Sequence, residues 1–509
     1  MKHLTTSLLF PLALIGCSEF DMASAEDAAA PGVAQAGAQD FGFFREILES
    51  GGLPGPDTID DIGFFNEHVI ELPDPNCGDS VCIHGRLGMM GNMINGGDCT
   101  IIMMGMNTPI DPDALERDPL NLVLAIDTSG SMNGDAMRFV KSGLTMMLEQ
   151  LEPDDMVTLI DFDTEARVIG QGSGADHDDL FTAIAGMSAG GSTNLFGALD
   201  LAYDTVELIR AEAAGAEVVI PRDDRIVLLS DGMATAGITE PEMISGLATA
   251  HAGDEILLTT IGVGSDFDFD LMKGMAEDGE GSFYYLEDPA AVEEVFIDEV
   301  TSFLVPIARD VSIDVSVVPG WRTRAVYGTR DFTFSDDRAA ISIDTLQIAG
   351  RTSAEDNAGG RRGGNGAIIV ELVPEDSPES GGVGTIDFAF TDTMADAQAS
   401  DLVDISTPFD PEKMQDGGQW FEDDQVEKAF VMLNIYAGFE MAANNVEQGD
   451  LEQALSTLVS LCQSVQAWVA DNPDPDIEDD LRYIDLFIEN LRMAGAGQPD
   501  APADPWPND

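Results

Sequence analysis

The sequence predicts a doubly wound, Rossmann-like α/β domain in the middle of the chain, flanked by a β-sandwich and a C-terminal helical segment. Three observations predict this fold class. Buried-strand and helical patterns alternate over 119–304, apolar and polar residues alternate with a period of two over 305–405, and long helical patterns fill 420–495. With 509 residues and a hydrophobic share of 44%, the chain is long enough to form several cores.

The central region shows the alternation that is typical of an open sheet covered on both faces. Residues 155–162 and 166–170 are predicted strands with a short connection, so we expect them to be antiparallel neighbours at one edge. The other predicted strands are 121–127, 224–232, 255–264 and 282–286, and the predicted helices are 133–151, 177–187, 194–210 and 289–304.

Short oxygen-bearing side chains follow the first strand of this region. The apolar run ends at Asp127, and Ser129 and Ser131 come next at alternate positions. An aspartate and two hydroxyls at this spacing can face one point above the strand end, and such oxygens suit a hard divalent cation. This D-x-S-x-S sequence resembles the metal-ion-dependent adhesion site (MIDAS) of von Willebrand factor type A (VWA) domains.

Two later segments extend the resemblance. The loop sequence G-G-S-T-N contains Thr193, and the predicted strand 224–232 ends in S-D-G, which contains Asp231. Ligands of doubly wound sheets bind outside the carboxyl ends of the strands, where Asp127 and Asp231 both lie. Three separated segments therefore agree with the VWA pattern in their order and spacing.

The resemblance implies a bound Mg²⁺, with Mn²⁺ or Ca²⁺ as alternatives, and gives a role to five residues. Ser129, Ser131 and Thr193 would be neutral ligands, whereas Asp127 and Asp231 would act largely through bound waters. Because Mg²⁺ prefers six oxygens in octahedral geometry, such a site keeps a position open. The resemblance implies that a carboxylate of a partner protein fills this position.

The N-terminus is typical of a targeting segment. A short apolar run follows Lys2 and ends in L-I-G-C, which resembles the lipobox of bacterial lipoproteins. The resemblance implies that 1–16 is a signal peptide, that Cys17 is lipidated, and that the protein is anchored in the cell envelope, with Ser18 favouring the outer membrane. An ordinary cleaved signal with a chance cysteine is the alternative. Residues 17–40 are small and acidic, which predicts a flexible tether.

Residues 41–118 carry a short helical pattern, the breaker L-P-G-P-D and paired aromatics, an order that resembles the N-terminal module before the A domain of bacterial VWA proteins. Three cysteines lie in this region. An exported compartment permits disulfides, so Cys77, Cys82 and Cys99 are candidates for a disulfide. Unpaired thiols, or a zinc set that includes His84, are the alternatives.

The regions after the central domain change in character. The predicted sandwich strands are 310–319, 323–328, 339–346, 366–374 and 384–392, and we expect strand 100–106, which precedes the central domain, to join their sheet. The predicted C-terminal helices are 424–445, 451–472 and 474–495, with Asp450 as the N-cap of the second. Residues 496–509 resemble a disordered tail.

Composition and motifs limit the function classes. The net charge of −71, from 23 basic and 94 acidic residues, argues against a nucleic-acid partner and against a polybasic contact with lipid. We expect no enzyme, because H-E-x-x-H and G-x-x-x-x-G-K are absent from the sequence. We expect a cation-dependent protein-binding lipoprotein of the cell envelope, for adhesion or assembly, that meets the membrane only through its lipid. A metal-independent scaffold, or an ancillary subunit of a channel or secretion complex, is the alternative.

Overall fold

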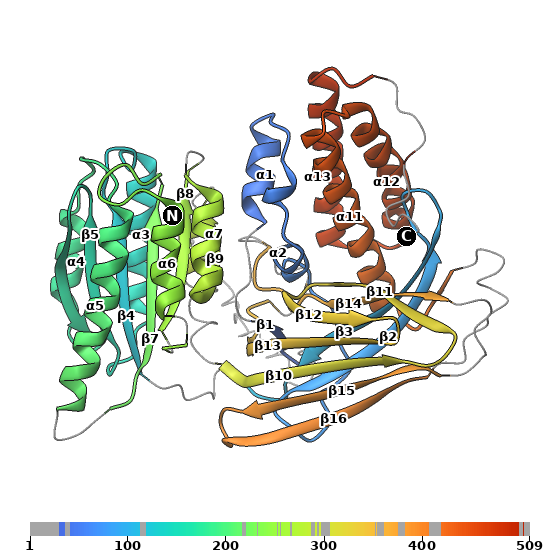
Figure 1. Ribbon diagram of the computed structural model, residues 1–509, viewed down its shortest axis with the longest axis horizontal. Coiled ribbons are helices and arrows are strands. Elements are labelled where there is room, and N and C mark those ends of the chain that lie inside the picture. Colours follow the sequence, from blue (N-terminus) through green and yellow to red (C-terminus); the bar gives the residue numbers. More distant parts are fainter. Residues whose placement is uncertain are drawn as a thin grey trace, which may run out of the picture.

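Figure 1 shows the computed structural model, in which an α/β domain lies beside a long antiparallel sheet that carries helices on one side. Two predicted features, the signal peptide 1–16 with Cys17 and most of the tail 496–509, lie outside the described residues. The structure describes residues 30–35, 41–111, 119–215, 220–231, 233–251, 253–254, 256–264, 267–286, 291–292, 295–296, 306–351, 353, 361–374, 382–406, 419–497 and 502.

The α/β domain contains a six-stranded sheet with the order β6-β5-β4-β7-β8-β9. Its strands are parallel except for β6, which pairs antiparallel with β5 at the edge, as predicted from the short connection between them. The strands are β4 (Leu120–Asp127), β5 (Met156–Phe162), β6 (Ala166–Ser173), β7 (Asp223–Ser230), β8 (Ile256–Val263) and β9 (Glu280–Leu286).

Helices cover both faces of this sheet, which confirms the predicted doubly wound fold class. One apolar core joins the sheet to α3 and α4, and a second joins its other face to α5, α6 and α7. The sequence patterns did not predict α6 and α7, and the helix predicted at 289–304 lies largely outside the described residues. The helices are α3 (Asp135–Glu149), α4 (Asp178–Gly186), α5 (Leu195–Ala214), α6 (Pro241–His251) and α7 (Phe269–Asp278).

The antiparallel domain is built from one hydrogen-bonded path of strands, β11-β14-β3-β1-β13-β10-β15-β16, with β2, β12 and β17 attached to it. The N-terminal strands are β1 (Gly32–Gln35), β2 (Cys82–Gly91) and β3 (Asp98–Asn107). The later strands are β10 (Pro306–Val317), β11 (Trp321–Tyr327), β12 (Asp331–Ser335), β13 (Arg338–Ile348), β14 (Ile368–Pro374), β15 (Gly382–Asp392), β16 (Ala397–Ser406) and β17 (Trp420–Phe421).

The path folds over itself into a sandwich. A Cβ added at Gly85 in β2 would meet the Ile386 and Ile405 side chains of β15 and β16, so these strands face one another across a common apolar core. The expectation that the strand at 100–106 joins this sheet is confirmed, because β3 pairs with β14 from Thr100↔Leu372 to Met104↔Ile368. The strands of the predicted module 41–118 therefore belong to the sandwich.

The tether predicted over 17–40 is wrong for residues 32–35. These residues form strand β1, which pairs with β3 and with β13 and is buried along its whole length. The sequence G-V-A-Q has one large apolar side chain, Val33, and its composition alone did not reveal that the rest of the sheet buries it.

Three long helices, α11 (Asp424–Glu447), α12 (Leu451–Asp471) and α13 (Pro475–Met493), follow the sandwich as predicted. Asp450 is confirmed as the N-cap of α12, because its side chain accepts a hydrogen bond from the Gln453 amide at 3.1 Å. Helix α11 lies at the centre of this helical domain and is buried along most of its length. Figure 1 shows α1 (Gly42–Glu49) beside these helices, and α2 (Asp61–Asn66), which follows the 3-10 turn Pro56–Thr58, contributes to the same core.

A buried ionic network joins the helical domain to the loop between β13 and β14. Lys428 of α11 donates to Asp476 of α13 at 3.0 Å, and Arg351 of the loop donates to the other oxygen of Asp476 at 2.8 Å. Arg361 donates to Asp480 at 2.7 Å, and His68 lies 2.8 Å from the same carboxylate. Burial favours the protonated acids, but the surrounding cations prevail and hold the pKa of Asp476 and that of Asp480 below the ordinary value.

Helix α1 also contacts the α/β domain. The ring of Phe43 stacks on Phe269 with centroids 4.9 Å apart, and it meets Phe267 and Tyr285 edge-on at 5.1 and 5.5 Å. Its neighbours Phe41 and Phe44 point the other way, into the core of the helical domain. Aromatic residues at the start of one short helix therefore contact both parts of the molecule.

The cysteines pair in one of the ways that the sequence left open. Cys77 and Cys82 form a disulfide, whereas Cys99 is a buried thiol whose Sγ lies 3.5 Å from Glu371. The third candidate cysteine was therefore wrong as a disulfide partner. The zinc alternative fails for the same reason, since disulfide sulfurs do not ligate zinc as thiolates, and His84 instead shares a 2.9 Å hydrogen bond with Asn107.

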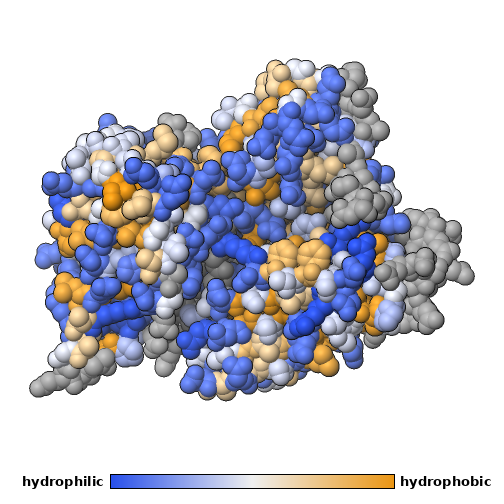
Figure 2. All heavy atoms as spheres, in the orientation of Figure 1, coloured by the Kyte–Doolittle hydropathy of each residue, from blue (hydrophilic) through white to orange (hydrophobic). Residues whose placement is uncertain are grey.

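Hydrophilic residues cover much of the face shown in Figure 2, as the large acidic excess of the composition requires.

Candidate metal site

Strand pairing brings the predicted site residues together. Strands β4 and β7 are parallel neighbours, with Ile126 opposite Leu229, so the loops that follow them leave the sheet side by side at its carboxyl edge. Asp127 is the last residue of β4, and Asp231 comes directly after β7. Residues that lie 104 positions apart in the sequence thus meet because their strands are adjacent in the sheet.

Asp127 is fully buried, and both of its carboxylate oxygens accept hydrogen bonds. The Ser129 amide donates to Oδ1 at 2.7 Å, and the Ser230 hydroxyl donates to Oδ2 at 2.6 Å. Burial raises the pKa of Asp127, these hydrogen bonds lower it in part, and the charge of Asp163 raises it further. A buried acid that is influenced by a second acid is stabilised in its charged form by a cation.

Three further oxygens converge beside this carboxylate. The hydroxyls of Ser129 and Ser131 lie 3.0 Å apart, and the Ser131 hydroxyl donates to Oδ1 of Asp231 at 2.7 Å. Ser129 and Asp231 are buried, whereas Ser131 is exposed, so the cluster opens to solvent on the side of Ser131. Hydroxyl and carboxylate oxygens in one cluster are the donor set that a hard divalent cation prefers.

The loop before α5 packs against the first loop through its backbone. The Gly190 amide donates to the Thr128 carbonyl at 2.8 Å, and the Gly130 amide donates to the Gly191 carbonyl at 3.2 Å. Gly191 has φ of 86°, and a Cβ there would lie 3.0 Å from the Cβ of Asp163, so the close approach requires glycine. This contact explains the second glycine of the G-G-S-T-N sequence.

Thr193 connects this loop to the one that carries Asp231. Its amide donates to the Thr235 hydroxyl at 2.9 Å, and its carbonyl accepts from the amides of Thr235 and Ala236 at 2.9 and 3.0 Å. Thr193 is only 4% exposed. These bonds use only the backbone of Thr193 and do not engage its hydroxyl.

The structure thus places all five candidate residues at one edge of the sheet, in the three loops that the sequence predicted. The sequence did not single out Ser230, Thr235 or Asp163, which hold or influence the predicted residues. Ser230 directly precedes the acid in S-D-G, and only the strand register shows that its hydroxyl reaches Asp127. Such contacts across strands have no signature in the sequence.

Other acidic clusters have structural partners. Asp161 and Asp163 form ion pairs with Arg167, with N–O distances of 2.9 and 3.2 Å. Asp268 is the N-cap of α7, and its side chain accepts a hydrogen bond from the Leu271 amide at 3.1 Å. Within the described ranges, no group of three or more His, Cys, Asp or Glu side chains is placed to hold a metal. The hydroxyl-rich set, with two carboxylates, is a different kind of site.

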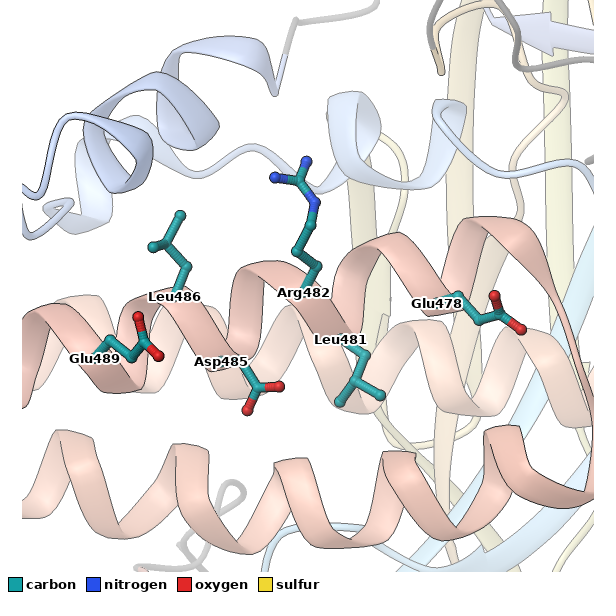
Figure 3. A pocket seen from close by; sticks show the side chains of 6 residues that line it. All are labelled: Glu478, Leu481, Arg482, Asp485, Leu486 and Glu489. Carbon is teal, nitrogen blue, oxygen red and sulfur yellow. The ribbon is translucent and has the colours of Figure 1, made fainter.

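A cavity of about 460 Å³ lies elsewhere, along the outer face of α13. Figure 3 shows its lining side chains along this one helix, with Arg482 and Leu486 pointing to one side of it. The lining residues are Glu478, Leu481, Arg482, Asp485, Leu486 and Glu489. This cavity has no connection with the sheet edge that carries Asp127.

Comparison with known proteins agrees with this geometry. Residues 120–285 match the family model described as the von Willebrand factor type A domain. The chain is 29% identical over 216 residues to the uncharacterized protein YfbK of Escherichia coli (strain K12), which covers 42% of this chain and 36% of YfbK. It is 27% identical over 211 residues to inter-alpha-trypsin inhibitor heavy chain H2 of Sus scrofa, which covers 40% of this chain and 22% of H2.

A solved structure is also similar over most of the chain. The von Willebrand factor type A protein from Catenulispora acidiphila is 14% identical, with a TM-score of 0.49, over 84% of this chain and 94% of that one. The chain spans about a third of the length of YfbK and about a fifth of that of H2. Residues 120–285 of this chain are therefore a VWA domain, related to parts of YfbK and of the inter-alpha-trypsin inhibitor heavy chains.

Proposed function

We propose that the VWA domain binds a divalent cation, Mg²⁺ or in its place Mn²⁺ or Ca²⁺, and through it a carboxylate of a partner protein. The observation that carries this proposal is the buried Asp127 carboxylate, which faces hydroxyls and a second acid at an edge where Ser131 is exposed. A cation there supplies the missing positive charge and, when bound, acts as a Lewis acid for an incoming oxygen.

The roles of the chain's own residues follow from their contacts. Ser129, Ser131 and Thr193 supply neutral oxygens, and Asp127 and Asp231 supply negative charge. Ser230 and the Ser129 amide hold the Asp127 carboxylate in one orientation, with donor–acceptor distances of 2.6 and 2.7 Å. The two carboxylates of the site only balance the charge of a divalent cation. The occupied site therefore has no excess negative charge that would repel an acidic group of a partner.

The charge of the whole chain supports a bridging cation. At a net charge of −71, the surface repels an acidic partner at long range. A carboxylate can bind such a surface only where a local positive charge outweighs that repulsion. We therefore propose a non-enzymatic binding protein in which the cation determines where the partner binds.

We also propose that the protein is held at the cell envelope, most simply at the outer membrane, by a lipid on Cys17. The support is the L-I-G-C sequence after a short apolar run. Among the helices that the structure describes, none is long and apolar enough to cross a membrane. Labelling of growing cells with a radioactive fatty acid tests the anchor, since Cys17→Ser should abolish incorporation and leave the folded domains unchanged.

A capture experiment tests the binding function. Full-length protein is incubated with envelope extract in Mg²⁺ or in EDTA, and Asp127→Ala is compared with the exposed control Asp387→Ala. We expect partner proteins to be captured only in Mg²⁺, by the wild type and by Asp387→Ala. Capture that survives both EDTA and Asp127→Ala would instead favour a metal-independent scaffold, whose flanking domains bind.

A further inference from the structure

Strand β1, the first element that the structure describes, lies in the interior of the antiparallel sheet. Residues Gly32–Gln35 pair antiparallel with β3 on one side, where Val33 lies opposite Met106, and with β13 on the other, where Val33 lies opposite Ile348. In the strand order, β3, β14 and β11 lie on one side of β1, and β13, β10, β15 and β16 lie on the other. Four residues therefore join two groups of strands into one sheet.

We call the position of β1, between the edges of β3 and β13, the slot. Both strands that line it, which are its walls, are also paired with other strands. Strand β2 pairs along the opposite edge of β3 as far as Cys82↔Asn107, and β10 pairs along the opposite edge of β13 as far as Pro306↔Gln347. On the inner edges, β14 and β12 pair with β3 and β13 only beyond the slot. If β1 leaves, both walls remain held, but their inner edges present unpaired backbone groups, which readily pair with another strand.

The place of β1 in the chain allows it to leave. It precedes every other element that the structure describes, so its withdrawal breaks no connection between the described strands of the sheet. On its other side, five residues, 36–40, connect it to the segment that starts at Phe41, which the helical core anchors separately. Short terminal elements open at a lower free-energy cost than the whole domain, because few contacts are lost.

The residues around the slot restrict which sequence can bind in it. A Cβ at Gly32 would lie 2.3 Å from the Cβ of Asn365, so the first position accepts glycine. The second position buries Val33 completely in the sandwich core, and at the fourth the Gln35 side-chain amide donates to the Gly328 carbonyl. An extended segment that reads Gly, small aliphatic, Ala, Gln fits these positions, and every copy of this chain carries one.

We propose that this slot exchanges strands between copies of the chain, so that residues 32–35 of one molecule complete the sheet of another. Reciprocal exchange gives a closed, two-fold symmetric dimer without creating a new type of contact. The five connecting residues span at most about 18 Å, so the partner's slot must lie close to helix α1 of the donor. The proposal is independent of the metal site, which lies on the other domain.

Engineered disulfides test the exchange in the full-length protein. Ala34 of β1 lies opposite Gln347 of β13, and both are at most 9% exposed. We would mix one chain that carries Ala34→Cys with a second that carries Gln347→Cys, oxidise the mixture and measure covalent dimers on a non-reducing gel. The exchange predicts dimers several-fold above a mixture of Gln347→Cys with Leu402→Cys, which places the first thiol on exposed β16. Dimers at or below this control level, while the double variant closes within one molecule, would overturn the proposal.

A second measurement does not depend on engineered thiols. Wild-type chains with two different affinity tags are incubated together and then purified through one tag. Exchange predicts that the second chain copurifies. It also predicts that Gly32→Val in both chains reduces copurification to background, because the valine side chain would clash with Asn365. Lack of copurification by the wild type, or copurification that Gly32→Val leaves unchanged, would count against the exchange.

Discussion

The hydroxyl of Ser131 donates a 2.7 Å hydrogen bond to Oδ1 of Asp231, across 100 positions of sequence. The bond joins the loop after β4 to the loop after β7, and it holds two of the proposed site residues in contact before any cation arrives. A site whose oxygens already converge loses little conformational freedom on binding, which favours affinity.

Ser131→Ala should weaken Mg²⁺ binding by about 10–100-fold, because it removes a proposed ligand that also orients Asp231. The side chain is exposed, so the change in the free energy of unfolding should stay within about 0.5 kcal/mol. Titration calorimetry of the full chain measures the affinity. Ser142→Ala, an exposed serine of α3, is the matched control and should bind as the wild type does. Equal affinities in the two variants would remove Ser131 from the site.

Asp61→Asn should change how stability depends on pH. Burial, and then the charge of Asp60, raise the pKa of Asp61 from 3.8 to about 7, and its Oδ2 accepts from the Gly328 amide at 2.6 Å. The folded protein keeps this proton to about pH 7, whereas the unfolded chain releases it near 3.8. Stability therefore falls as the pH rises from about 4 to 7, and the asparagine variant should not show this loss.

The size of this effect can be bounded. The difference between a pKa of 3.8 and one of about 7 corresponds to at most about 4 kcal/mol of unfolding free energy, and we expect about 1–2 kcal/mol after relaxation of the site. Urea unfolding at pH 5 and pH 8 measures it. Asp61→Asn should be more stable relative to the wild type at pH 8 but not at pH 5. The exposed control Asp387→Asn should show the same dependence of stability on pH as the wild type. A gain of the same size at both values of pH would show that Asp61 does not titrate as described.

Lys428→Met should destabilise the helical domain by about 3–5 kcal/mol, because it leaves the buried carboxylate of Asp476 without one of its cations. Denaturant unfolding followed by circular dichroism measures the change. Arg482→Met breaks an ion pair with Glu49 at the surface and should cost less than about 1 kcal/mol. If the two substitutions cost the same, the buried network contributes no more than a surface pair.

The same network predicts acid sensitivity. The pKa of Asp476 and that of Asp480 are lowered in the folded state, so the stabilisation is present above the unfolded value of about 3.8 and is lost as the pH falls below it. The helical signal should therefore melt at lower temperature with each step from pH 5 to pH 3. A melting temperature that is constant over this range would contradict the account of the network.

Phe43→Ala should uncouple the α/β domain from the helical domain, since this ring stacks on Phe269 and meets Phe267 and Tyr285. We expect calorimetry to resolve separate transitions for the two parts, with a loss of about 1–3 kcal/mol from the contact. Phe334→Ala, which removes a ring that is 49% exposed on β12, should leave the transitions as in the wild type. Unchanged transitions for Phe43→Ala would mean that other contacts hold the parts together.

Local patterns predicted most of the fold. The run before Asp127 is apolar because β4 is buried on both faces, and the loops that carry Ser129, Thr193 and Asp231 follow elements with clear periodicity. The five candidate residues were therefore visible in the sequence.

What the sequence did not reveal depends on contacts between distant segments. Ser230 reaches Asp127 only through the register of β4 and β7, and Phe43 reaches the α/β domain although the rings beside it belong to another core. Strand β1 was mistaken for part of a tether because G-V-A-Q is small and weakly apolar, and its burial comes entirely from β3 and β13.

The proposed metal site is tested most directly by anomalous X-ray diffraction from crystals of the full chain soaked in Mn²⁺, which replaces Mg²⁺ and scatters anomalously. We expect one strong anomalous peak at the carboxyl edge of the sheet, about 2.2 Å from the hydroxyl oxygens of Ser129, Ser131 and Thr193. Absence of a peak there, or a peak bound only by other residues, would contradict the proposed metal site.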